Sequence, residues 1–234
     1  MEKTLKVSRR ELKYFINNFQ KTSLIETLKQ ALIQDKHNYG DGYPIRSLYF
    51  DNYANTDFYE KLDGVENRKK IRLRIYSSED QKAKLEIKRK YGDNQVKSSV
   101  VISKEDALKL IECDYDVLQK YESDTAKTIY NIMKVNHLRP VVLIEYKRKA
   151  FIHEMNNIRI TIDSDIRASE TDFRLFEKEP ILKPIEYYHN VLVEVKYDGF
   201  LLNWITNILS RYQMTRTSYS KYSNSRFIFE SYLA

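Results

Sequence analysis

Charged side chains recur at every second position in several apolar stretches of this sequence. Lys84, Glu86 and Lys88 are separated by Leu and Ile, and Arg72 and Arg74 are spaced in the same way. Residues two apart point to the same face of a β-strand, so each set would form one charged face. Arg and Lys that converge on one surface are typical of phosphate binding. Glu among them indicates a divalent cation bridging to phosphate oxygens, because hard cations prefer oxygen ligands.

The same spacing recurs elsewhere in the chain. It links three further sets: Glu11 and Lys13, Glu194 and Lys196, and Arg159 with Thr161 and Asp163. For any single strand, the simpler explanation is an ordinary half-exposed strand with its charged face in water. The repetition across strands, with Ile, Leu and Val on the opposite faces, favours a shared charged interior. Such an interior is costly to bury and must hold water, ions or a highly charged ligand.

Alternation and turn residues predict the elements that would position these side chains. Eight strands are expected, at Leu5–Ile16, Ile45–Asp51, Lys70–Tyr76, Lys82–Lys88, Lys97–Ile102, Val141–Arg148, Ile158–Asp163 and Val191–Lys196. Helical periodicity predicts helices after caps at Ser23 and Ser103, and over Thr56–Asp63, Tyr115–Val135 and Phe200–Tyr212. Short connections between the strands favour an antiparallel α+β fold over a doubly wound one.

The composition limits the classes of protein to consider. The 234 residues contain 40 Lys and Arg against 33 Asp and Glu, a net charge of +7 that is too balanced for a basic tail. Aromatic residues make up 13%, which argues against intrinsic disorder. The five glycines leave no room for a Gly-rich phosphate loop, and the single cysteine suits a reducing cytoplasm. We expect one domain over residues 1–234, with no signal peptide and no transmembrane segment.

These features together predict a particular α+β architecture. A sheet of about eight antiparallel strands would close, or nearly close, into a β-barrel with a charged lumen, because closure removes the exposed edges. The amphipathic helices would pack outside and cover the apolar face of the sheet. The lumen would then hold a metal–polyphosphate ligand.

The sequence resembles a known family in several motifs that cover nearly the whole chain. They are Arg10–Tyr14, Ser47–Asn52, Ile71–Tyr76, Leu85–Lys88, Tyr146–Phe151, Val191–Lys196 and Ser218–Ser223. In order and spacing the set resembles the VTC-domain polyphosphate polymerases, which belong to the triphosphate tunnel metalloenzymes of the CYTH-like superfamily. The resemblance implies an eight-stranded tunnel that binds triphosphate or growing polyphosphate with Mn²⁺ or Mg²⁺.

By matching position, the resemblance also implies site residues. The phosphate-binding residues would be Lys13, Arg72, Arg74, Lys88, Lys97, Arg148, Arg159, Lys196 and Lys221. The catalytic group would comprise Arg72, Arg74, Arg148, Arg159 and Glu194. Glu194 would be the main metal ligand, with Glu11 and Glu86 as helpers. One departure is informative: the superfamily's Glu-x-Glu-x-Lys signature is here Glu11-Leu12-Lys13, which weakens a plain triphosphatase assignment and resembles the polymerase branch.

The implied function is polyphosphate synthesis from the γ-phosphate of ATP. The alternatives are an inorganic triphosphatase or NTP hydrolase on the same fold, and a non-enzymatic module that binds polyphosphate or nucleotide. Nucleic acid is not expected as a partner, because its binding needs no carboxylates. Coupling to membrane translocation would need a partner membrane protein, since the accessory membrane segments of the eukaryotic polymerases are not expected here.

Two positions stay open from the residues alone. Arg148 shares a face with Tyr146 on an ideal strand, whereas Glu145 and Lys147 face the other way, and a bulge would change this. Lys221 lies in a Ser- and Tyr-rich tail, where an edge strand is as good an interpretation as a ligand role.

Overall fold

The computed structural model describes residues 9–92, 94–185 and 190–230. In that part of the chain, one sheet contains β1 (Arg9–Asn17), β2 (Ile33–Gln34), β3 (Tyr43–Asp51), β4 (Arg68–Ile75), β5 (Lys82–Tyr91), β6 (Asn94–Ser103), β7 (Arg139–His153), β8 (Ile158–Ser169), β9 (Lys183–Pro184), β10 (Asn190–Asp198) and β11 (Thr215–Arg216). The main path runs β11-β1-β10-β8-β7-β3-β4-β5-β6, and neighbouring strands are antiparallel.

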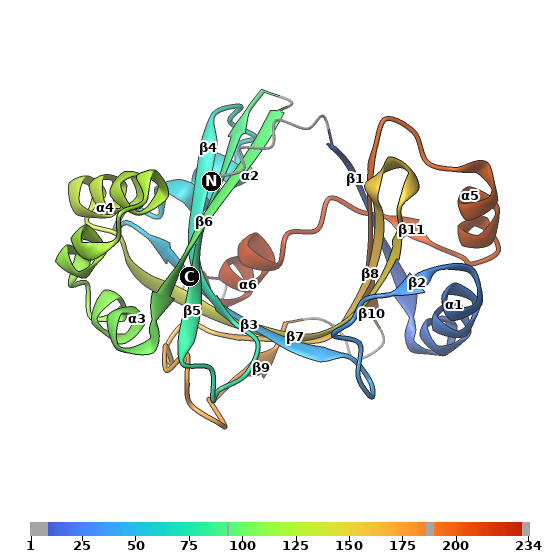
Figure 1. Cartoon of the computed structure of the whole chain (residues 1–234), viewed down its shortest axis with the longest axis horizontal. Helices are drawn as coiled ribbons and strands as arrows, with labels where there is room; N and C mark the ends of the chain where they lie inside the picture. Colours follow the sequence, from blue (N-terminus) through green and yellow to red (C-terminus); the bar gives the residue numbers. More distant parts are fainter. Residues whose placement is uncertain (1–8, 93, 186–189, 231–234) are drawn as a thin grey trace.

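The sheet curves into a trough with a floor and two walls (Figure 1). The central strands β3 and β7 form the floor. On one side β4, β5 and β6 rise as a wall that we call the β4 wall, and on the other side β8, β10 and β1 form the β10 wall. The charged faces predicted from the sequence line the inside of this trough.

The prediction that the sheet closes, or nearly closes, into a barrel was wrong. The eight predicted strands are the eight long ones, and three two-residue strands, β2, β9 and β11, bring the total to eleven. Within the described residues no ladder joins β6 to β1 or β11. Between the two walls, Lys88 Nζ of β5 lies 3.8 Å from an oxygen of Glu11 of β1, a side-chain contact without backbone pairing.

Helices cover the outer faces of both walls, as the amphipathic patterns predicted. Against the β4 wall pack α3 (Lys104–Ile111) and α4 (Asp124–Asn136), in a core where Leu73 and Leu85 meet Leu110 and Ile129. Against the β10 wall pack α1 (Asn18–Ala31) and α5 (Asn203–Ser210). The walls are therefore apolar outside and charged inside.

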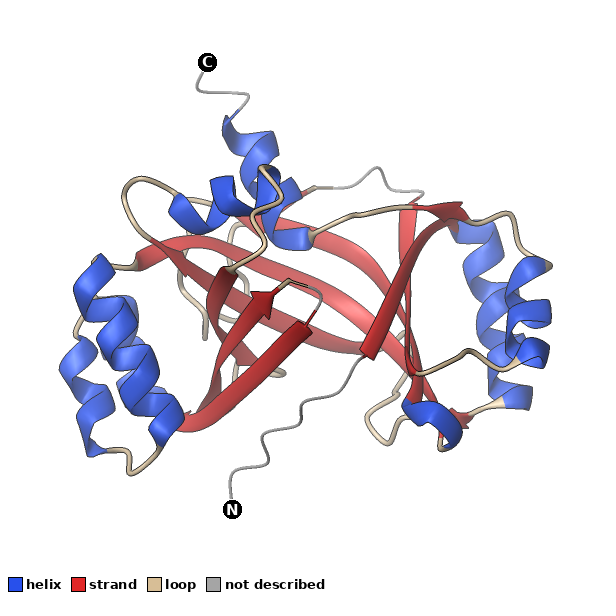
Figure 2. Cartoon of the chain, turned by 90° about the horizontal axis from the view of Figure 1, so that it is seen from above, coloured by secondary structure: helices blue, strands red, loops and turns tan. Residues whose placement is uncertain are grey.

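One helix contradicts the prediction that all helices pack outside. The last helix, α6 (Lys221–Glu230), lies within the outline of the trough (Figure 1) and toward one end of it (Figure 2). Its Tyr222 is buried with Tyr49, Ile144 and Ile166 from the inner face of the sheet. The floor of the trough is apolar enough to need a cover, and α6 supplies it with help from Phe58 in α2 (Thr56–Leu62).

The predicted elements were found with a few local corrections. Helix α1 begins after Asn17, whose side chain accepts from the backbone of Gln20, so the cap is not Ser23. The stretch predicted as one helix over Tyr115–Val135 is a 3₁₀ helix (Tyr115–Lys120) followed by α4, because Ser123 starts a new cap. A second 3₁₀ turn covers Met155–Asn157. Leu5–Ser8 of the first predicted strand lies outside the described residues.

In the described ranges, none of the helices combines the length and the apolar character that crossing a bilayer requires.

Candidate active site

The inside of the trough gathers the basic residues that the sequence singled out. The β4 wall contributes Arg72, Arg74, Lys88 and Lys97, and the β10 wall contributes Lys13, Arg159 and Lys196. Arg148 comes from the floor strand β7, and Lys221 is the first residue of α6. The edge-strand alternative for Lys221 was therefore wrong. The helix start turns this side chain into the trough.

Glu194 lies at the centre of the largest charge cluster. Its two carboxylate oxygens are 3.1 Å from Lys196 Nζ, 3.4 Å from Lys221 Nζ, 3.7 Å from Lys13 Nζ and 3.7 Å from Arg148 Nη2. The residue is 6% exposed. Burial alone would favour the protonated form, but the four cations outweigh it and hold the pKa of Glu194 well below its usual value. The carboxylate is thus kept ionised and surrounded by positive charge.

Asp163 is part of this cluster, although the sequence analysis gave it no role. The fully buried carboxylate accepts from Nε and Nη2 of Arg148 at 2.6 and 2.7 Å, and it lies 2.6 Å from Lys221 Nζ. Burial opposes the charge on Lys221, but Asp163 and Glu194 more than offset it and raise the pKa of that lysine. The signal was present in the sequence, since Asp163 shares a strand face with Arg159.

The structure settles which way Arg148 points. The ladder with β3 places Arg148 opposite Tyr43 and Tyr146 opposite Ile45, so both side chains face the trough. A register shift in the pairing with β8 falls between Glu145 and Lys147, and beyond it Arg148 pairs with Asp163. The shift aligns the guanidinium with the carboxylate it binds.

A second cluster forms around Glu86 on the β4 wall. Arg72 binds one Glu86 oxygen through Nε and Nη2 at 2.7 and 2.6 Å, and Lys97 lies 2.5 Å from the other. Arg74 is more distant, at 3.9 Å, and donates to Ser47 instead. Burial lowers the pKa of Lys97 to about 8, against the pull of Glu86 in the other direction. Burial would raise the pKa of Glu86, but Arg72, Arg74 and Lys97 hold it far below its usual value.

Glu11 links the Glu194 cluster to a lysine of the β4 wall. One of its oxygens is 3.3 Å from Lys13 Nζ and the other is 3.8 Å from Lys88 Nζ on the opposite wall. Lys13 also contacts Glu194, so one ammonium group is shared by two carboxylates. Lys13 further donates to the backbone oxygen of Tyr219, which ties β1 to the segment before α6.

Arg159 is the predicted residue that stands apart. It pairs with Lys196 in the β8–β10 ladder, but its guanidinium turns to Asp35 at 2.7 Å and to the Tyr43 hydroxyl at 3.2 Å. It lines the trough at the end where Tyr43 and Tyr76 lie, with ring centroids 6.3 Å apart. Its present partners place it at the rim of the site.

The carboxylates suit a particular kind of metal site. Among the described residues, no group of three or more His, Cys, Asp or Glu side chains is arranged to hold a metal by itself. Glu194 and Glu11 do converge on one cation, the ammonium of Lys13. Mg²⁺ is commonly held by one or two carboxylates together with substrate phosphates. Carboxylates placed in this way suit a divalent ion that shares its coordination with phosphate. Glu86 instead contacts Arg72 and Lys97.

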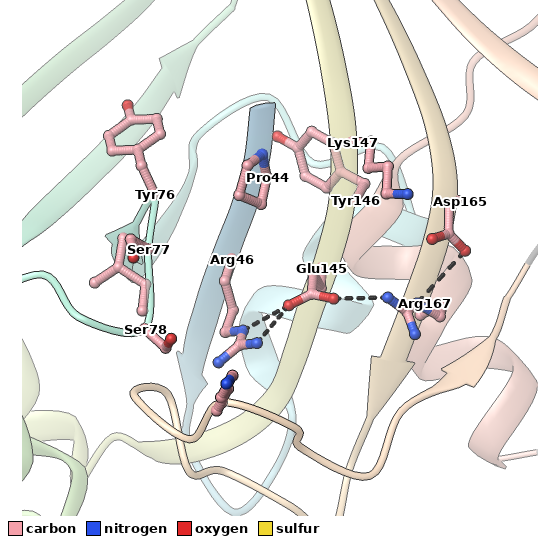
Figure 3. Close-up of a pocket in the computed structure, with 12 residues that line it drawn as sticks. Pro44, Arg46, Tyr76, Ser77, Ser78, Glu145, Tyr146, Lys147, Asp165 and Arg167 are labelled. Atoms are coloured by element: carbon pink, nitrogen blue, oxygen red, sulfur yellow. Dashed lines mark hydrogen bonds and ion pairs between the residues drawn. The ribbon is translucent and has the colours of Figure 1, made fainter. Parts of the chain in front are cut away.

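Another cavity, of about 270 Å³, is lined by residues that include Tyr76 and Tyr146 (Figure 3). There Glu145 sits between Arg46 and Arg167, with oxygens 2.6 Å from Arg46 Nη2 and 2.9 Å from Arg167 Nη2. Four basic residues, Arg46, Lys147, Arg167 and Lys178, line this cavity with two acidic ones, Glu145 and Asp165. The larger group of basic residues is inside the trough, where the nine predicted basic residues face five carboxylates: Glu11, Asp35, Glu86, Asp163 and Glu194.

Comparison with solved structures identifies relatives of this fold. A candidate adenylate cyclase from Bacillus halodurans superposes with a TM-score of 0.55 at 12% identity, covering 93% of this chain and 95% of that one. A candidate adenylyl cyclase from Hippeastrum, described as having a dominant triphosphatase activity, gives 0.54 at 12% identity, covering 95% of each chain. At this level of identity the likeness establishes the fold.

Sequence comparison is more specific. Vacuolar transporter chaperone complex subunit 4 of Trypanosoma cruzi is 25% identical over 221 aligned positions, which cover 78% of this chain. They cover 28% of that relative, so the chain corresponds to little more than a quarter of its length. The VTC domain family matches residues 8–229. The resemblance seen in the motifs is thereby confirmed, and the chain belongs to the VTC domain family.

Proposed function

We propose that this chain, as a single domain, transfers the γ-phosphoryl group of ATP to a growing polyphosphate chain, with Mn²⁺ or Mg²⁺ as cofactor. The observation that carries the proposal is Glu194, a buried carboxylate kept ionised by four cations inside a basic trough. A surplus of Arg and Lys on facing walls suits a polyanion, and an ionised Glu among them suits a metal bridging to phosphate. Membership of the VTC domain family supports this substrate class.

The roles of the residues follow from phosphoryl-transfer chemistry. The protein has to align the phosphates and neutralise charge on the phosphoryl oxygens. Arg72 and Arg74 from the β4 wall and Arg148 from the floor would bind the transferring and neighbouring phosphates, and Arg159 of the β10 wall would contact them at the rim. Lysines of the same lining, Lys13, Lys88, Lys97, Lys196 and Lys221, would hold further phosphates. When bound, a divalent ion at Glu194 and Glu11 supplies additional charge neutralisation at the phosphate oxygens.

The state of the carboxylates favours polymerisation over hydrolysis. Hydrolysis calls for a general base to activate water, and an efficient base has a pKa near the working pH. Cations hold the pKa values of Glu11, Glu86 and Glu194 below their usual values, against the effect of burial, which makes all three weak bases. A terminal phosphate of polyphosphate is already ionised and needs no base. Hydrolysis of triphosphate remains the second candidate, since a hydrolase on this fold would use the same phosphate ligands.

The decisive experiment is to incubate the protein with ATP and Mn²⁺ and to measure ADP, free phosphate and long-chain polyphosphate separately. Polymer that accumulates in step with ADP is the expected result, with reactions containing EDTA as the control. Free phosphate in step with ADP, without polymer, would replace the proposal with a hydrolase. Binding of ATP without any ADP would replace it with a binding module.

A further inference from the structure

The last strand of the β4 wall, β6, has one free edge. Its ladder with β5 includes all ten of its residues, Asn94–Ser103. In the part of the chain that the structure describes, no strand pairs with the other edge of β6. The backbone N–H and C=O groups of alternate residues point to opposite edges of a strand, so about half of these residues present unpaired groups. Such an edge is a template for another strand.

The features that normally protect a sheet edge are weakly developed in β6. At the opposite end of the sheet the edge strand β11 has only two residues, whereas β6 has ten. The register of β6 with β5 does not shift, so no bulge turns the edge away, and the strand contains no proline. Its one charged residue, Lys97, is paired with Glu86 at 2.5 Å. The edge is therefore long, regular and able to pair with a further strand.

The two faces of β6 define which side chains an added strand should carry. The residues on the inner face are all exposed: Gln95, Lys97, Ser99 and Val101. On the outer face, Ile102 is buried in the core that the β4 wall shares with α3 and α4, and Val100 packs partly against that core. A strand added to the edge would continue both faces. Its outward side chains should therefore be apolar, and its inward ones should suit the trough.

The inward side chains of an added strand would meet a row of lysines. The β5 residues that pair with the inner face of β6 are Lys84, Glu86, Lys88 and Lys90, and β6 itself adds Lys97. Four lysines thus stand with one glutamate in the last two strands of the wall. Acidic side chains complement this charge. A second copy of this chain is a poorer partner, because its β6 would add another lysine and no carboxylate.

We propose that the free edge of β6 binds an extended segment of a protein partner as an added strand, with acidic side chains facing the trough and apolar side chains facing outward. Main-chain hydrogen bonds would supply affinity, and the alternating side chains would supply specificity. The acidic side chains would lie near Lys88 and Lys97, so the segment and tripolyphosphate should weaken each other's binding. The inference requires only the edge and its charges, and it does not depend on the proposed function.

The probe for this edge is a fluorescein-labelled peptide of ten residues in which Glu and Val alternate. Fluorescence anisotropy should show that it binds, that tripolyphosphate displaces it, and that a Lys-Val peptide of the same length does not bind. Two further peptides are N-methylated, one at every Glu and the other at every Val. Each methylation pattern removes the N–H groups of one edge only, so one of these peptides should bind at least about tenfold more weakly than the other.

Val101 provides a matched pair of protein variants. Its side chain is exposed on the inner face, and it has no role in the candidate active site. Val101→Glu should bind the Glu-Val peptide at least about threefold more weakly than Val101→Lys, because the charge facing the inward Glu residues changes sign. Val135→Glu, on the outer helix α4, is the control and should bind the peptide as wild type does. Circular dichroism checks that the variants are folded.

Equal affinities of the two methylated peptides would overturn the inference, because the Glu-Val peptide would then bind by charge and not by pairing with an edge. Failure of the Glu-Val peptide to bind would also overturn it, as would equal affinities of Val101→Glu and Val101→Lys. Sedimentation of the protein alone tests the remaining occupant. A dimer that the Glu-Val peptide dissociates would assign the edge to a second copy of this chain and overturn the proposed partner.

Discussion

Arg148 and Asp163 face each other across the β7–β8 ladder and form a two-bond ion pair, with Nε and Nη2 donating at 2.6 and 2.7 Å. The carboxylate is fully buried and also lies 2.6 Å from Lys221. Asp163 thus holds two cations that both approach Glu194. It links the floor of the trough, the β10 wall and the start of α6, and it orients the side chains proposed to grip phosphate.

Replacing Asp163 with Asn should destabilise the protein markedly. The change keeps the shape of the side chain but leaves the buried cations Arg148 and Lys221 without a charged partner nearby other than Glu194. Removing one partner of a buried ion pair costs about 3–5 kcal/mol, and we expect a fall of about 3 kcal/mol in the free energy of unfolding. Urea denaturation monitored by circular dichroism measures it.

The matched control is Asp165→Asn on the same strand, where the partly exposed carboxylate is 3.4 Å from Arg167. Exposed pairs contribute about 0–1 kcal/mol, so this variant should unfold nearly as wild type does. Equal effects at both positions would mean that the Arg148–Asp163 pair does not organise the site.

Replacing Glu194 with Gln should reduce turnover of ATP by at least about 100-fold, because it removes a charged ligand from the proposed metal site. Tripolyphosphate affinity measured without metal should stay the same or increase, since a negative charge next to the phosphate is lost. Release of ADP in the presence of Mn²⁺ measures the turnover, and calorimetry without Mn²⁺ measures the affinity for tripolyphosphate. Glu105→Gln, on the outer helix α3, is the control. Unchanged turnover of Glu194→Gln would exclude Glu194 from the site.

The affinity for tripolyphosphate should fall as the pH rises above about 8. Burial lowers the pKa of Lys97 to about 8, so the free protein loses this charge above that pH, and a bound anion has to restore it by proton uptake. Affinity then drops by up to about tenfold per pH unit. The arginine of Lys97→Arg stays protonated over this range. The ratio of its tripolyphosphate affinity to that of wild type should therefore rise by up to about tenfold per pH unit between pH 8 and 9.5. Calorimetry over this pH range measures the affinities, with Lys127→Arg as the control. If the affinities of wild type and Lys97→Arg change in the same way with pH, Lys97 is not the titrating group.

Asp57 provides a test of stability against pH. Burial raises its pKa to about 6, although it lies 2.8 Å from Lys69. The folded state therefore binds a proton between about pH 4 and 6 that the unfolded state lacks, and this group lowers the free energy of unfolding as the pH rises. Asp57→Asn should match wild type near pH 4 and exceed it by about 1–3 kcal/mol at pH 7.

Urea denaturation at several pH values measures this difference. The control is Asp63→Asn at the exposed end of the same helix, which should unfold nearly as wild type does at pH 7. A variant Asp57→Asn that is less stable than wild type at pH 7 would show that the bond to Lys69 outweighs the cost of burial.

Much of the architecture could be predicted from the sequence because the strands alternate so regularly. Period two assigned Arg72, Glu86 and Glu194 to inner faces, and Leu73 and Val195 to outer ones, and the structure has them there. The family resemblance then added Lys221 to the predicted ligands. The alternation of strand residues could not predict where its side chain points, because Lys221 starts a helix instead of continuing a strand.

The remaining features depend on relationships between distant segments. Closure of the sheet requires a ladder between its edges, and no local pattern tells whether Lys88 and Glu11 will meet as side chains or as paired backbones. The burial of α6 inside the trough depends on apolar residues of the inner face of the sheet, such as Ile144 and Ile166, which look like ordinary core positions. Lys70 alternates like Arg72 but belongs to no motif. The structure was needed to show that it lines a cavity of about 280 Å³ together with Lys13 and Lys88.

The gap between β6 and β1 has a consequence for how a long substrate would be loaded. A closed barrel would admit a polymer only through one of its open ends, so a free end of the polymer would have to enter first. Here Lys88 of β5 and Glu11 of β1 contact each other across the trough at 3.8 Å, and side chains can move aside without breaking any backbone pairing. A polyphosphate strand whose ends are already held elsewhere would therefore be able to enter sideways, somewhere along its length.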